Sequence, residues 1–144
     1  ISSGAYQRAV AATGVEVELV CAACPGFVEF VERGETRSEQ VHVLAERLLA
    51  PLVEADVDTL LLGCTHYPFL ARTISDVMGR DVVLVSSADE TAFEVRRTLF
   101  AVDDRSRSGV GRHRFFSSGD IDWFRTLGRQ LLGPELGHVE ACPW

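Results

Sequence analysis

The sequence contains neither lysine nor asparagine, so its 14 basic side chains are all arginine. A pyridoxal phosphate enzyme needs a lysine amine for its Schiff base. A phosphate-binding loop of the G-x-x-x-x-G-K-[ST] type needs a lysine that contacts the phosphates. The chain can supply neither chemistry. The same absences fit a GC-rich coding sequence, so arginine usage alone carries no functional weight.

Positive charge is scarce and long apolar runs are missing. The formal net charge is −7 and the sequence pI is about 5.0. A nucleic acid or an anionic membrane requires a basic surface, so neither is an expected partner. No apolar run approaches the roughly 18 residues that span a bilayer, and the first residues do not resemble a signal peptide. These features predict a cytoplasmic protein.

Cysteine is too sparse for a disulfide scaffold, because four thiols are spread over 144 residues at positions 21, 24, 64 and 142. We expect reduced thiols. Cys21 and Cys24 form a C-x-x-C that could be redox-active, or could be half of a zinc site completed by Cys64 and His66. A second cysteine pair at matching spacing is absent, so we expect no metal.

The chain opens at Ile1 and its one methionine is Met78, which favours the carboxy-terminal part of a longer protein. A hydrophobic fraction of 47% is enough to bury a core in one domain, or in two lobes of which one is incomplete.

Helical and strand periodicities alternate along most of the chain. Helices are expected at residues 2–12, 24–33, 36–55, 67–78 and 87–100, with capping boxes opened by Thr36 and Ser87. Strands are expected at 15–20, 57–64 and 82–85, the last two buried. A loop at 103–112 separates these from a strand at 113–118, a helix at 121–132 capped by Asp120, and a short strand at 138–141. The order predicts an α/β fold with a doubly wound, mostly parallel sheet and flanking helices.

Residues 63–68 fall between the central strand and the next helix, where open α/β sheets bind ligands. A thiol before a helix amino terminus is favoured as thiolate. Cys64 is therefore a candidate nucleophile or base, with Thr65 as a hydroxyl or N–H donor and His66 as a proton partner. The alternative is that Cys64 is a small buried apolar residue and His66 an ordinary hydrogen-bonded histidine.

The hexapeptide at residues 63–68, Gly-Cys-Thr-His-Tyr-Pro, resembles the second catalytic-cysteine motif of glutamate racemases. Segments at 3–6, 23–32, 58–64, 85–92 and 115–120 also resemble successive parts of that family. The resemblance covers essentially the whole chain, and the hexapeptide is its most specific part.

The resemblance implies that glutamate is inverted at its α-carbon without a cofactor, by two cysteines on opposite faces of the substrate. It makes Cys64 one of the two, His66 the group that assists proton transfer, and Thr65 a substrate-binding residue. Glu32 falls where the family has an auxiliary carboxylate, although an exposed helix residue is the alternative. The product, D-glutamate, would supply peptidoglycan synthesis.

The family's first catalytic cysteine, with its Asn-Thr or Asn-Ala neighbours, does not occur in this chain. The resemblance thus implies a two-lobed, pseudo-symmetric fold of which only the back portion is present. Residues 1–86 would form most of the second lobe, and residues 87–144 would complete the first. We expect the chain alone to be inactive and to need the missing first lobe as its partner. A homodimer is left open.

Two other readings stay open. One is a non-catalytic α/β module that keeps a glutamate-binding half-site. The other is an aspartate racemase-like enzyme, although that family tends to carry Glu where His66 stands. Four aromatic residues late in the chain are expected in a core, or exposed if the first lobe is absent: Phe115, Phe116, Trp123 and Phe124.

Overall fold

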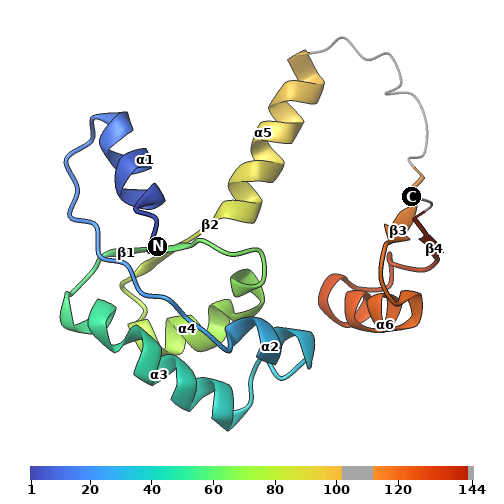
Figure 1. The fold of residues 1–144 in the computed structure, drawn as a ribbon, viewed down its shortest axis with the longest axis horizontal. Helices are drawn as coiled ribbons and strands as arrows, with labels where there is room; N and C mark the ends of the chain where they lie inside the picture. Colours follow the sequence, from blue (N-terminus) through green and yellow to red (C-terminus); the bar gives the residue numbers. More distant parts are fainter. Residues whose placement is uncertain (102–111, 143–144) are drawn as a thin grey trace.

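The computed structural model describes residues 1–101 and 112–142. It is an α/β structure whose described strands form two parallel pairs, β1–β2 and β3–β4 (Figure 1). The predicted loop at 103–112 falls, apart from Arg112, outside the described residues. The elements in chain order are α1 (Ala5–Thr13), α2 (Phe27–Glu32), α3 (Glu39–Glu54), β1 (Thr59–Leu62), the 3₁₀ helix η1 (Tyr67–Leu70), α4 (Ala71–Met78), β2 (Val83–Ser86), α5 (Ser87–Ala101), β3 (Phe115–Ser117), α6 (Ile121–Leu132) and β4 (Val139–Ala141).

Side-chain caps fix where several helices begin. The Asp120 carboxylate accepts a 2.7 Å hydrogen bond from the Trp123 amide and starts α6, as the sequence predicts. The predicted capping residues of α3 and α5 are wrong. The Ser38 hydroxyl, not that of Thr36, accepts from the α3 backbone, and Ser86 rather than Ser87 accepts from the first turn of α5.

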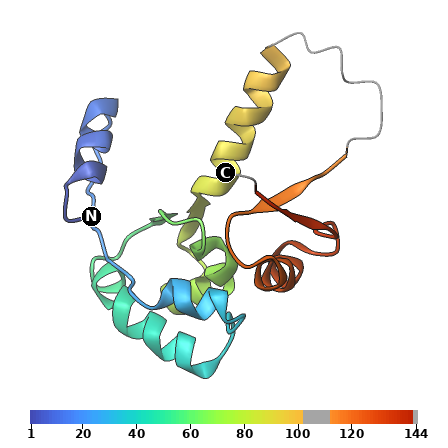
Figure 2. The ribbon, with the colours of Figure 1, turned by 45° about the vertical axis from the view of Figure 1, so that its right-hand side comes forward.

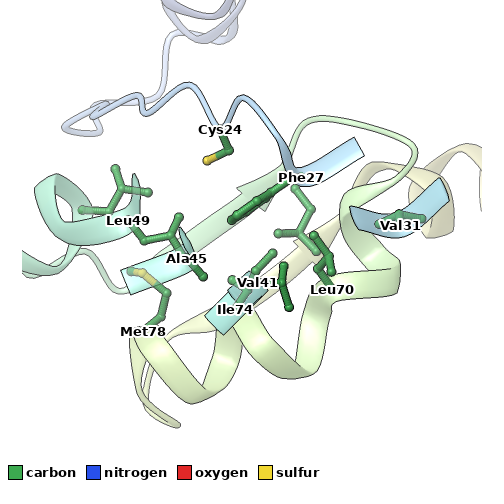
Figure 3. Packing of buried hydrophobic residues seen from close by; sticks show 11 residues of the cluster. Cys24, Phe27, Val31, Val41, Ala45, Leu49, Leu70, Ile74 and Met78 are labelled. Atoms are coloured by element: carbon green, nitrogen blue, oxygen red, sulfur yellow. The ribbon is translucent and has the colours of Figure 1, made fainter. Parts of the chain in front are cut away.

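One hydrophobic core lies among α2, α3, η1 and α4. The buried residues of α3 recur at helical spacing, and those of α4 face them. Figure 3 shows Phe27, Val41 and Ile74 converging from three different helices. The cluster consists of Cys24, Phe27, Val31, Val41, Ala45, Leu49, Leu52, Leu62, Leu70, Ile74 and Met78.

The β1–β2 sheet covers this core with one face only. The strands pair in parallel, from Thr59 opposite Val83 to Leu62 opposite Ser86, with η1 and α4 between them in sequence. Leu62 is buried against the core. Leu61 and Val83 are 50% and 59% exposed. The predicted burial of these strands on both faces is therefore wrong, because helices of the described chain cover one face of the sheet alone.

The strand predicted at residues 15–20 is also wrong, because these residues form no strand. Val15, Val17 and Leu19 are all exposed. Alternating apolar residues become a strand only when a neighbouring strand supplies hydrogen bonds, and the described residues offer this segment none. It lies instead beside α1, across an open hollow of about 620 Å³.

Helix α5 projects away from this core in both ribbon views and has no buried residue (Figures 1 and 2). After residues 102–111, which the structure does not describe, β3 and β4 pair in parallel and α6 lies between them in sequence, with Leu131 of α6 packed against the core. Phe116 and Trp123 are 43% and 50% exposed there. These two aromatic residues are therefore not in a core, and the alternative prediction, that they are exposed, is the one that describes them. The Gln130 side chain donates a 3.4 Å hydrogen bond to the Gly34 carbonyl and links α6 to the turn after α2.

None of the helices in the described part of the chain is both long and apolar enough to cross a membrane.

Candidate active site

Cys64 lies two residues beyond the carboxyl end of the parallel strand β1, as the sequence predicts, and is partly buried. Cys64 is followed by the 3₁₀ turn of η1, which runs directly into the α-helix α4 at Ala71. A 3₁₀ turn is a common start of an α-helix, so the effect of this helix terminus on the thiol stays a prediction.

The fold brings Glu32 to His66. Glu32 ends α2, and its Oε1 lies 3.5 Å from His66 Nε2, across 34 positions of sequence. The other ring nitrogen, Nδ1, lies 3.4 Å from the Thr65 hydroxyl. The side chains of His66 and Glu32 remain 33% and 42% exposed. The imidazole of His66, two positions after Cys64 in the sequence, therefore has a carboxylate near one ring nitrogen and a hydroxyl near the other, an arrangement that fixes ring orientation.

Tyr67 joins the cysteine turn to the core. Its hydroxyl donates a 3.2 Å hydrogen bond to the Cys24 carbonyl, and its ring meets Phe27 edge to face with centroids 5.4 Å apart. Burial, and secondarily the neighbouring thiols of Cys24 and Cys64, raise the pKa of Tyr67 to about 12. The phenol therefore stays protonated as a hydrogen-bond donor at any physiological pH.

Two further hydroxyls hold the backbone immediately before Cys64. The Tyr6 hydroxyl donates a 3.1 Å hydrogen bond to the Gly63 carbonyl, and the Ser87 hydroxyl donates a 3.2 Å bond to the Leu62 carbonyl. No role at this site is predicted from the sequence for Tyr6, Tyr67 or Ser87. Their partners lie 25 to 57 positions away, and no local spacing reveals such contacts.

The other cysteines are not arranged for metal binding. Cys21 and Cys24 are free thiols, and burial raises the pKa of Cys24, which makes it a poor nucleophile. Across residues 1–101 and 112–142, no group of three or more His, Cys, Asp or Glu side chains could hold a metal ion. The C-x-x-C therefore gains no further ligands from Cys64 and His66.

Two hollows in the described part of the chain lie away from the candidate residues. The hollow beside α1 is lined by residues of α1 and of 15–19. A second hollow, of about 500 Å³, lies between the start of α3 and α4. Glu32, Cys64, Thr65 and His66 line neither of them.

No protein-family model matches the chain, but individual relatives do. The glutamate racemase of Acidothermus cellulolyticus is 52% identical over 141 residues, which are 96% of this chain and 53% of that protein. A crystal structure of a Bacillus anthracis glutamate racemase isoform matches with a TM-score of 0.88 at 32% identity, over 99% of this chain and 53% of the other. The Thermus thermophilus glutamate racemase in complex with β-chloro-D-alanine matches at 0.80 and 36% identity, over 98% and 52%.

The chain thus spans about half the length of the relatives it matches. By sequence identity and by fold, the chain belongs to the glutamate racemase family and corresponds to the carboxy-terminal portion of its members.

Proposed function

We propose that this chain supplies one half of a glutamate racemase active site, in which Cys64 exchanges a proton with the α-carbon of glutamate on one face. The observation that carries the proposal is the Glu32–His66 pair at 3.5 Å. His66 lies two positions after Cys64, in a chain 52% identical over 141 residues to a glutamate racemase. The second thiol would come from the amino-terminal half that the relatives possess.

The chemistry requires two thiols. A thiolate on one face removes the α-proton and becomes a thiol, leaving the electron pair on the α-carbon. A thiol on the opposite face then donates its proton to that carbon and becomes a thiolate. One proton is taken, another is given, and the configuration is inverted. Since an α-proton is far less acidic than a thiol of pKa about 8.5, both groups must be oriented closely and the carbanion stabilised electrostatically.

The neighbours of Cys64 have roles that follow from their contacts. His66 would accept and return the proton at Cys64, and Glu32 would orient the imidazole. The Thr65 hydroxyl either stays on His66 Nδ1, 3.4 Å away, or turns to a substrate oxygen. His66 and the naming of the relatives as glutamate racemases favour glutamate over aspartate.

We also propose that residues 1–86 form most of the second lobe and residues 87–144 return to complete the first. Two features support this division. The β1–β2 sheet and its core end where α5 begins, and α5 carries exposed apolar residues such as Phe93, Val95 and Leu99. An amphipathic helix with no buried residue is expected to pack against chain outside the described part. The parent enzyme would be cytoplasmic and would supply D-glutamate for peptidoglycan.

The test is reconstitution. The chain is assayed for interconversion of D- and L-glutamate by circular dichroism, alone and mixed with the separately produced amino-terminal half of the Acidothermus cellulolyticus relative. We expect no turnover by the chain alone, turnover by the mixture, and loss of that turnover with Cys64→Ser. Cys142→Ser is the matched control and should leave turnover unchanged.

Racemisation by the isolated chain would overturn the requirement for a second half. Full turnover by a Cys64→Ser mixture would overturn the role of Cys64. If calorimetry detects glutamate binding to the chain while no active mixture forms, the result favours the non-catalytic half-site module instead.

A further inference from the structure

We propose that Tyr6 is a positioning residue for the Cys64 thiol, acting through the peptide that joins Gly63 to Cys64. The inference rests on the proposed function of Cys64 and adds a residue to its machinery. Its starting observation is the 3.1 Å hydrogen bond from the Tyr6 hydroxyl to the Gly63 carbonyl, which connects α1 to the end of β1 across 57 positions.

The geometry of the peptide bond makes this contact directional. The carbonyl of Gly63 and the amide N–H of Cys64 belong to the same planar, trans peptide and point in opposite directions. A donor that fixes the carbonyl therefore also fixes where the Cys64 N–H points and where the Cys64 Cα lies. Tyr6 thus anchors the backbone from which the thiol projects.

The packing at Gly63 agrees with this contact. Its φ is not in the left-handed region, so backbone conformation does not demand glycine there. A Cβ built on Gly63 would overlap the Tyr6 hydroxyl and come within 3.1 Å of the ring carbon Cζ. A side chain at position 63 would therefore displace the Tyr6 hydroxyl from the Gly63 carbonyl.

The carbonyls of the residues before and after Gly63 also accept hydrogen bonds. Ser87 bonds the Leu62 carbonyl at 3.2 Å, and the Tyr67 amide bonds the Cys64 carbonyl at 3.2 Å. With Tyr6 on Gly63, three successive carbonyls leading through the cysteine have donors. Tyr6 differs from the other two because it comes from α1, which has no buried residue and is not part of the core. Removing its hydroxyl therefore loosens the turn without breaking the core.

The first experiment uses this chain alone and measures amide hydrogen exchange by mass spectrometry. Tyr6→Phe keeps the ring and removes the donor. We expect exchange in residues 63–66 to accelerate roughly three- to tenfold, the range that one hydrogen bond contributes, while exchange in α3 stays unchanged. Gln7→Ala is the matched control. It removes the neighbouring contact from α1 to Cys21 and should leave residues 63–66 unaffected.

The second experiment measures steady-state kinetics in the reconstituted mixture. Tyr6→Phe should lower kcat up to about tenfold with KM within twofold, because misplacing the thiol slows proton transfer more than it weakens binding. Gly63→Ala should lower kcat when residue 6 is tyrosine. The same substitution should lower kcat less in the Tyr6→Phe variant, because the hydroxyl that the new methyl group would overlap is then gone.

Each claim is overturned by a different result. Unchanged exchange at 63–66, equal acceleration in α3, or the same response with Gln7→Ala would overturn the inference. Local acceleration with unchanged kcat would overturn the positioning role. If the unsubstituted mixture shows no turnover, the proposed function fails, and the exchange data still decide whether Tyr6 fixes the cysteine turn.

Discussion

Tyr67→Phe tests how the cysteine turn is attached to the core. The substitution keeps the edge-to-face contact with Phe27 and removes the 3.2 Å hydrogen bond to the part-buried Cys24 carbonyl. A lost hydrogen bond costs about 1 kcal/mol, and a buried carbonyl left without a donor raises the cost to about 1–3 kcal/mol. We expect the free energy of unfolding to fall by that amount.

The assay is urea unfolding followed by circular dichroism at 222 nm, which reports the helices of the chain, among them α3 and α4 of the core. Tryptophan fluorescence would follow the wrong region, because Trp123 lies in α6. Tyr6→Phe is the comparison. It removes a tyrosine hydrogen bond of similar length that is exposed, and it should cost less than Tyr67→Phe. A loss below about 0.5 kcal/mol for Tyr67→Phe, or a larger loss for Tyr6→Phe, would refute this account of the turn.

The same residue gives the fold an alkaline limit. The folded-state pKa of Tyr67, about 12, lies above the value of about 10 for a tyrosine in the unfolded chain. The protonated phenol therefore stabilises the fold fully below pH 10, and this contribution is lost as the pH rises towards 12. Tyr67→Phe should flatten the fall in stability over that interval. An equally steep fall in the variant would contradict the assignment.

Three further predictions concern other parts of the chain. Glu32→Gln should reduce turnover of the reconstituted mixture at least tenfold and change stability by less than about 1 kcal/mol, as expected for a partly exposed ion pair; equal turnover would refute its role. Ile74→Ala should cost about 2–5 kcal/mol in urea unfolding, whereas the exposed Val83→Ala should stay within about 0.5 kcal/mol; similar costs would contradict the one-sided core. The hydrogen bond from Arg114 lowers the pKa of Glu140, so the stabilisation of the β3–β4 pair is present above pH 4.5 and lost as pH falls. Glu140→Gln should remove this acid dependence in a dichroism titration, and its persistence would count against the pair.

Local patterns in the sequence were enough for most of the helices. The buried residues of α3 follow a helical period, and Asp120 caps α6 as predicted. These features depend on residues within one or two turns of each other, so a single sequence contains the information. The same holds for the position of Cys64 just beyond a parallel strand, because a short apolar run followed by a turn is local.

Contacts between distant residues decided the rest. The sequence could propose Glu32 only by resemblance, and its position 3.5 Å from His66 depends on how α2 packs against η1. The link from Tyr6 to Gly63 spans 57 positions and leaves no periodic signal. Residues 15–20 have the right alternation for a strand and form none, because a strand requires a neighbour and not only a pattern. The sequence by itself determined most of the helices and the family. The tertiary structure decided which faces are buried and which side chains hold the turn around Cys64, because burial and hydrogen bonding depend on partners far away along the chain.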